Sequence, residues 1–188
     1  MANRKEVIRI IRDFEPDLVF SHRPNDYHPD HRYSAALVQD AAYIVTVPNM
    51  CPLTPHLETN PVIMYLSDNF QKPNPFEPDV VLDIDDVIER KVDMLHCHTS
   101  QMYEWLPYNS GVLDEVPEEE GARREWMANR RLKAYSETAE RFRGQLVEIY
   151  GKDRGGQVKY AEAFEVCEYG LSLTNERREI LFPFLKAA

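Results

Sequence analysis

The chain has 188 residues, of which 43% are hydrophobic, and this length supports one globular domain with a real core rather than two. Its formal net charge of −10 argues against a nucleic-acid partner, because binding to phosphates depends on clustered Lys and Arg. The three cysteines form no CxxC pair and no apolar run approaches the ~18 residues of a membrane span, so we expect a cytoplasmic protein without disulfides.

The first third of the chain predicts helix, strand and helix in turn. Apolar residues at helical spacing predict a helix over about 3–14, which Pro16 ends because proline cannot donate a helix hydrogen bond. The short apolar run "DLVFSH" predicts a buried strand with His22 near its C-terminal end. A broad apolar face then predicts a helix over about 30–45, with Pro29 suited to its first turn.

The middle of the chain predicts a long loop, two strands and a third helix. The segment "PNMCPLTPHLETNP" holds four prolines in fourteen residues and should be irregular. The runs "PVIMYLS" and "DVVLDI" are typical of strands. An Asp suited to N-capping and apolar residues on one side predict a helix over about 86–98.

The last third is predicted to be mainly helical. Residues 119–149 are charged and rich in helix formers, and we expect one long helix that ends at Gly151. The Gly-rich segment 152–157 predicts a turn or flexible loop. The segment "YAEAFEVCEYG" that follows fits either a strand or a helix.

The alternation of strands and helices predicts an α/β fold with a mostly parallel sheet flanked by helices. We expect a single domain over 1–188, with the core sheet and site loop in about 1–115 and the helix and C-terminal extension in about 119–188. In such sheets ligands bind beyond the carboxyl ends of the strands. The segment "SHRPNDYHPDH" lies in that place and is the candidate site.

His28 and His31 flank the first turn of the predicted second helix and can point into one crevice. Imidazole nitrogens are good ligands for zinc, iron or nickel, and a neighbouring carboxylate can orient a ring by accepting its other N–H. The helix N-terminus also favours negative charge. Taken alone, these residues leave a metal or catalytic site and an ordinary pair of surface histidines equally open.

Other polar residues can serve the same crevice. Arg23, Asp26 and Tyr27 either contact the hydroxyls of a polar substrate or fix the loop by hydrogen bonds to its backbone. His98 ends the third predicted helix, where it either contacts substrate or caps the helix. Further residues could be recruited as metal ligands, although no spacing singles them out, namely His22, Asp26, His56, Asp68 and His98.

The stretch "PDLVFSHRPNDYHPDHR" resembles the second motif of the LmbE-like family of zinc-dependent N-deacetylases, which includes the PIG-L N-acetylglucosaminylphosphatidylinositol deacetylases. "DVIERKVDMLHCHTSQ" resembles the later His-x-Ser-Gln helix of that family, and "YAEAFEV" is similar to a weaker C-terminal stretch. The resemblance implies a Rossmann-like fold and hydrolysis of an acetamide on a sugar, such as an N-acetylglucosamine compound, or on a related amine. A homo-oligomer is also expected from it.

The resemblance implies roles for particular residues. His31 would be a ligand of zinc or another divalent transition metal, and His28 would stabilise the tetrahedral oxyanion or protonate the leaving amine. Asp30 would orient His28. Arg23, Asp26, Tyr27 and His98 would contact the substrate.

The chain departs from the family in one respect. The Ala-His-Pro-Asp-Asp motif, which carries the other metal ligands and the general base, is absent from this sequence. The sequence therefore resembles the C-terminal part of such a protein, an N-terminally incomplete version of the fold. An inactive fragment or a partner-dependent half enzyme stays an alternative, and a metal-dependent phosphoesterase is a weaker one because no run of carboxylates suits a two-metal site.

Overall fold

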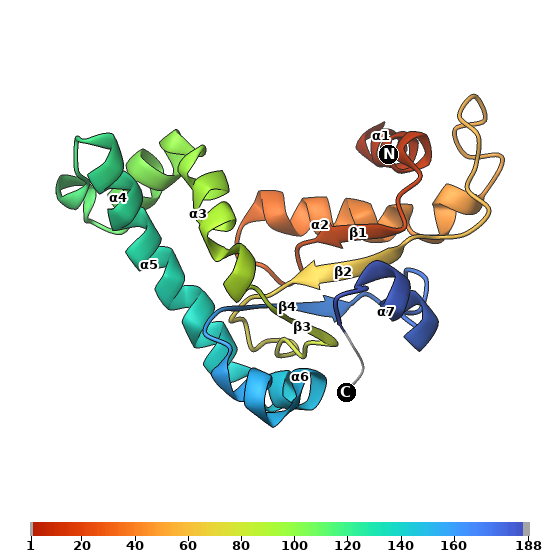
Figure 1. The fold of residues 1–188 in the computed structure, drawn as a ribbon. Helices are drawn as coiled ribbons and strands as arrows, with labels where there is room; N and C mark the ends of the chain where they lie inside the picture. Colours follow the sequence, from red (N-terminus) through yellow and green to blue (C-terminus); the bar gives the residue numbers. More distant parts are fainter. Residues whose placement is uncertain (1, 186–188) are drawn as a thin grey trace. The chain divides into compact units, whose positions relative to one another are not determined.

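Four short strands form one sheet in the order β1-β2-β4-β3 in the computed structural model, which describes residues 2–185. The strands are β1 (Leu18–Ser21), β2 (Val62–Leu66), β3 (Val80–Asp83) and β4 (Ala161–Val166). The chain divides into two compact units, residues 2–80 with 163–185 and residues 81–162, and this division runs through β3 and β4. Helices flank the small sheet, which confirms the predicted α/β class (Figure 1).

The sheet is mixed in direction. β1 and β2 are parallel, with Leu18 opposite Val62 and Ser21 opposite Tyr65, as the sequence predicts. β4 runs antiparallel to β2, a direction that the sequence did not predict. Because β1 and β2 run the same way, their carboxyl ends adjoin at one edge of the sheet. The loop that follows β1 carries the candidate site.

The first unit begins with α1 (Ala2–Phe14), which confirms the first predicted helix. Its apolar face packs with the end of α2 (Pro29–Ala41), and α2 runs alongside β1 (Figure 1). A short 3-10 helix, Tyr43–Thr46, takes up the rest of the second predicted helix. The core of this region is a buried cluster of Ile8, Ile11, Ala41, Val45 and Cys51.

Arg12 ties α1 to the Pro-rich loop that was predicted to be irregular. Its side chain is buried, with 2% exposed, and donates to main-chain carbonyls at 2.6 to 3.3 Å. The acceptors belong to Ile44, Val45, Val47, Met50, Cys51 and Thr54. A buried guanidinium with satisfied donors replaces the regular hydrogen bonds that this irregular segment lacks.

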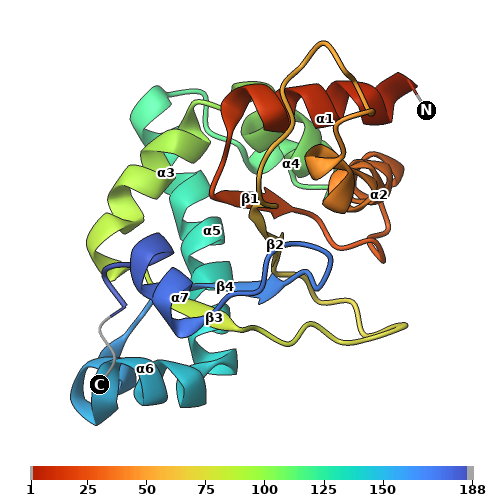
Figure 2. The ribbon, with the colours of Figure 1, turned by 90° about the vertical axis from the view of Figure 1, so that its right-hand side faces the viewer.

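The second unit is mainly helical. The third predicted helix is confirmed in part, because the 3-10 turn Asp85–Val87 precedes α3 (Ile88–His96). α5 (Glu120–Arg141) packs beside α3 around buried Val92, Tyr103, Met127 and Ala128 (Figure 2). Short helical segments connect the two, namely a π-helical turn Gln101–Trp105, α4 (Leu106–Asn109) and the 3-10 turn Leu113–Glu115.

The prediction of one helix over 119–149 is wrong. α5 ends at Arg141, Phe142 takes non-helical φ and ψ of −111° and 25°, and α6 (Arg143–Gln157) begins after it. The buried Phe142 ring explains the break, because the side chain turns into the interior at that point. Gly151 interrupts α6 with a φ of 79°.

The prediction of a turn or loop over 152–157 is also wrong, because α6 resumes after Gly151 and continues to Gln157. Arg143 donates to the carbonyls of Gly155 and Val158 at 2.8 and 2.7 Å, which satisfies acceptors at the helix end. Gly155 itself lies against the backbone of Leu146, where a Cβ would sit 2.3 Å from the carbonyl oxygen. The glycine content of this segment predicted flexibility, whereas Gly155 is required for close packing against Leu146.

The remaining helix is α7 (Asn175–Leu181), capped by the Thr174 hydroxyl. Among residues 2–185, no helix combines the length and the apolar character needed to cross a membrane.

We predict that Arg12→Met lowers the free energy of unfolding by about 3 kcal/mol, because several buried carbonyls lose their donor at once. Arg9→Met, on the same helix, is the matched control, since the Arg9 side chain is 40% exposed and pairs with Glu6 one turn away. This variant should change stability by less than about 0.5 kcal/mol. Urea unfolding of both variants measures the difference. Equal losses of stability in the two variants would show that the carbonyl contacts of Arg12 do not stabilise the loop.

Candidate functional site

The site loop, residues 22–28, leaves the carboxyl end of β1 and enters α2. His28 is the N-cap of α2, with φ and ψ of −81° and 129°, and its Nδ1 accepts the N–H of Asp30 at 3.2 Å. Pro29 occupies the first helical turn, where its missing N–H is no loss. The local sequence thus fixes the start of α2 so that His28 and His31 lie on its first turn.

His22, Asp26 and His31 come together in one cluster. Each offers a ligand atom, and these atoms lie within 4.8 Å of one another. The rings of His22 and His31 stack with centroids 4.0 Å apart and planes at 7°. His22 arrives from the end of β1 and His31 from the first turn of α2, so the strand-to-helix connection creates the cluster.

Asp26 joins the cluster to the helix start. Its Oδ1 accepts the backbone N–H of His28 at 2.8 Å, and its Oδ2 lies 3.1 Å from Nδ1 of His31. Partial burial alone would raise the pKa of Asp26, but these hydrogen bonds outweigh burial and lower its pKa. Asp26 is therefore an ionised carboxylate, and the group that faces it on His31 is an Nδ1–H.

The imidazole of His22 is held in its neutral form. Burial lowers the pKa of His22, and the nearby His31 lowers it further, while Asp26 acts in the opposite direction. A neutral imidazole keeps a lone pair on one nitrogen, which is the form that binds a metal.

The donor set fits a divalent transition metal. Two imidazoles and one carboxylate are the protein ligands of several catalytic zinc sites, which keep the fourth position open for water or substrate. The same two-His, one-carboxylate set also suits ferrous iron. Asp26 Oδ2 and His31 Nδ1 lie 3.1 Å apart, so a metal bound by both would take the place of the proton that they share in the metal-free chain. The cluster can therefore hold a metal.

His28 lies next to the cluster, and Asp30 contacts it differently from expectation. The His28 ring centroid is 4.8 Å from that of His31. The Asp30 carboxylate is 4.0 Å from His28 Nδ1 and its side chain is 87% exposed, so the close contact of Asp30 is through its backbone N–H. The role of Asp30 as an orienting carboxylate stays a prediction.

The other residues expected to contact substrate lie in different settings. Tyr27 is 71% exposed and its ring stands edge-on to His28 and His31. Arg23 is 4% exposed and pairs with Asp68 at 3.3 Å. Their roles in binding stay predictions.

His98 belongs to the unit of residues 81–162. Its backbone N–H donates to the carbonyl of Leu95 at 3.0 Å, just after α3. Its contact with substrate stays a prediction, as does the alternative of a capping histidine.

His22 is the residue whose part in the cluster the sequence alone did not single out. The sequence placed it at the end of a strand, but nothing in its spacing linked it to His31. Asp26 was expected either to contact substrate or to fix the loop, and it forms hydrogen bonds with His28 and His31. The available signal was the position of both residues beyond the carboxyl end of a parallel strand.

No family model matches the chain. A diacetylchitobiose deacetylase from Thermococcus kodakarensis is 33% identical over 119 residues, which cover 56% of this chain and 41% of the deacetylase. That identity supports the resemblance to the LmbE-like and PIG-L-type family.

Solved structures share the fold. N,N'-diacetylchitobiose deacetylase from Pyrococcus horikoshii aligns with a TM-score of 0.54 and 20% identity, over 89% of this chain and 52% of that one. The 4-carboxy-2-hydroxymuconate hydratase GalB from Pseudomonas putida aligns with a TM-score of 0.56 and 17% identity, over 91% of this chain and 60% of the hydratase. A conserved protein from Thermus thermophilus aligns with a TM-score of 0.53 and 19% identity, over 90% of this chain and 60% of that protein. The chain thus spans between 41% and 60% of the length of these relatives.

The geometry of the cluster predicts that His22→Ala weakens zinc binding as much as His31→Ala does, because each variant removes one of two imidazoles. His56→Ala is the control, since His56 lines a different cavity together with Asp17 and Asn60. Zinc content after dialysis, measured by elemental analysis, gives the comparison. Full zinc content in His22→Ala would remove His22 from the metal site.

Proposed function

We propose that this chain carries the site of a metal-dependent hydrolase that removes an acetyl group from an N-acetylated sugar, such as an N-acetylglucosamine compound, or from a related amine. The observation that carries the proposal is the cluster of His22, Asp26 and His31. The identity with a diacetylchitobiose deacetylase supports the choice of reaction. A shared fold alone would not, because the same fold also occurs in a hydratase.

His22, Asp26 and His31 would hold the metal, for which zinc is our assignment. When bound, zinc polarises an amide carbonyl and lowers the pKa of a bound water to ~7. In the metal-free chain Asp26 orients His31 by accepting from Nδ1, and an ionised acceptor makes this hydrogen bond stronger than a neutral one. The chain's own contribution is a pair of imidazoles held in fixed orientation.

His28 would act on the reacting amide. Because its Nδ1 accepts the Asp30 N–H, the neutral ring carries its proton on Nε2. That proton can be donated to the oxyanion of the tetrahedral intermediate or to the departing amine nitrogen. The His28 side chain is 41% exposed, so a substrate can reach it.

The exposed Tyr27 ring beside these histidines offers a surface for the sugar. Aromatic faces pack on the apolar faces of sugar rings, and Tyr27 adds a hydroxyl for hydrogen bonding. We assign Tyr27 to substrate binding on this basis.

A partner-dependent half enzyme is the second candidate. It is supported by the share of the Thermococcus deacetylase that the chain covers, 41%. In that case the cluster would bind metal, and acetate release would require a second polypeptide segment.

We predict that His28→Gln lowers kcat for acetate release by about 10²- to 10⁴-fold, the usual contribution of a general acid or base, and leaves zinc content unchanged. Asp30→Asn should have a much smaller effect, because its backbone N–H still donates to His28. Acetate release from N-acetylglucosamine and diacetylchitobiose, together with zinc content, measures both variants. A loss in Asp30→Asn as large as in His28→Gln would instead support the orienting carboxylate.

The zinc-loaded wild-type chain decides between the two candidates. Acetate release that a chelator abolishes and zinc restores supports the deacetylase. Stoichiometric zinc without acetate release would favour the partner-dependent half.

A further inference from the structure

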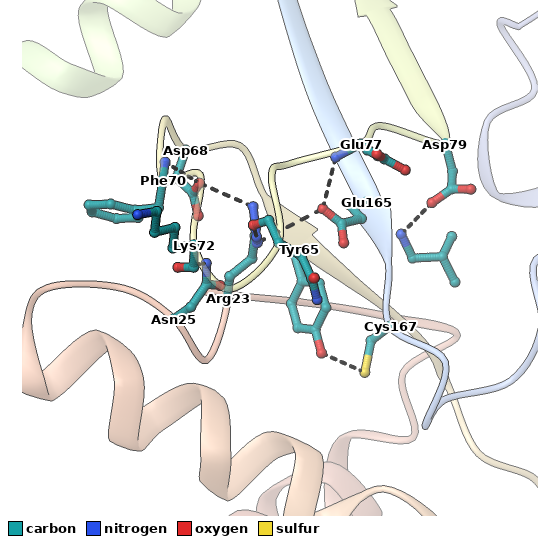
Figure 3. A network of polar contacts seen from close by, with 12 residues as sticks. Arg23, Asn25, Tyr65, Asp68, Phe70, Lys72, Glu77, Asp79, Glu165 and Cys167 are labelled. Atoms are coloured by element: carbon teal, nitrogen blue, oxygen red, sulfur yellow. Dashed lines mark hydrogen bonds and ion pairs between the residues drawn. The ribbon is translucent and has the colours of Figure 1, made fainter.

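Arg23 directly follows a member of the metal cluster, yet it reaches in a different direction. His22 stacks on His31, whereas the Arg23 guanidinium lies among acceptors from β4 and from residues 67–79, the connector between β2 and β3. Its Nη1 is 3.3 Å from Oδ1 of Asp68 (Figure 3). Its Nη2 donates to the carbonyl of Asn74. A third acceptor, Glu165 of β4, lies 3.9 Å from Nε.

This ion pair is largely shielded from solvent. The side chains of Arg23 and Asp68 are 4% and 13% exposed. Water therefore screens the pair weakly, and removal of one partner leaves a poorly solvated charge. The Phe76 ring covers the guanidinium with its centroid 5.8 Å from Cζ. Arg23 is thus fixed within the protein instead of projecting toward a substrate.

The connector contacts the site loop at several points besides Arg23. The Asn25 side chain donates to the carbonyl of Lys72 at 3.3 Å. The rings of Tyr27 and Phe70 are 6.0 Å apart. Phe70 is itself placed by Asp68, whose Oδ1 accepts the Phe70 N–H at 2.9 Å (Figure 3). Asp68 therefore holds both the site loop and the connector.

We infer that Arg23 and Asp68 are positioning residues for the metal cluster: their ion pair fixes the site loop and so sets where His22 and Asp26 lie. The inference rests on the proposed metal site. It replaces substrate contact as the role of Arg23, because a guanidinium that is 4% exposed and directed at Asp68 and Asn74 has little surface to offer a ligand.

The physical basis is the cost of organising ligands. A metal site binds tightly when its donors are already held in place, and groups that orient the ligands commonly contribute about 10- to 100-fold in metal affinity. His22 lies one residue before Arg23, and Asp26 lies three residues after it. If the ion pair is lost, the loop between them gains freedom that metal binding must then remove.

The test is titration of the full chain with Co²⁺ alone, followed by visible absorption, for wild type, Asp68→Asn and Arg23→Lys. Asp68→Asn keeps an acceptor for the Phe70 N–H and removes the charge. We expect both variants to raise the Kd for Co²⁺ by about 10-fold or more. Urea unfolding of each variant shows that it is folded.

Asp83→Asn is the matched control. Asp83 also pairs with an arginine, Arg154, its side chain is 10% exposed, and its Oδ1 accepts the N–H two residues ahead at 3.0 Å. Asp83 lies in the other unit, residues 81–162. The Asp83→Asn substitution should therefore lower stability without changing the Kd for Co²⁺. A role in stability alone would leave the Kd unchanged in both Asp variants, and that result would overturn the inference.

A second readout does not depend on the metal. In NMR spectra of the metal-free chain, the imidazole ¹⁵N and ¹H signals of His22 and His31 should shift in Asp68→Asn and stay in place in Asp83→Asn. The reason is that the two rings stack with centroids 4.0 Å apart, so their signals depend on the position of the site loop. Unshifted signals in Asp68→Asn would contradict the inference. A wild-type chain that binds no Co²⁺, with these shifts present, would instead contradict the proposed metal site.

Discussion

Parallel pairing of β1 with β2 is the constraint on which the site depends. With Ser21 opposite Tyr65, the two strands end at the same edge of the sheet, and the loops that follow them must meet. His22 and Arg23 follow β1, and Asp68 follows β2. An antiparallel pair would have sent these loops to opposite edges. The fold thereby places ionisable side chains in contact that are 45 residues apart.

Within this arrangement, Asp26 links structure to chemistry. One carboxylate accepts the N–H of His28, which helps fix the start of α2, and lies 3.1 Å from Nδ1 of His31, which orients that ring. The N–H of Asp30 donates to Nδ1 of His28, which fixes the tautomer of the neutral His28 ring. The "NDYHPDH" segment therefore encodes both a helix start and the orientation of two imidazoles.

Local patterns predicted much of the fold and pointed to the segment that carries Asp26 and His31. Helical spacing gave α1, the apolar runs gave β1 to β3, and Pro29 marked the start of α2, because each signal is contained in a few neighbouring residues. The break at Phe142 and the helical turns around Gly155 depend on packing partners that no local pattern reveals. The same holds for His22, whose stacking on His31 exists only because β1 ends beside α2.

X-ray absorption at the zinc edge of the zinc-loaded chain tests the central claim most directly. A metal held by His22, Asp26 and His31 should show two imidazoles in the ligand shell, with Zn–N distances of about 2.0–2.1 Å and no sulfur. His22→Ala should retain one imidazole. A shell with sulfur, or one without imidazole, would place the metal elsewhere and contradict the account.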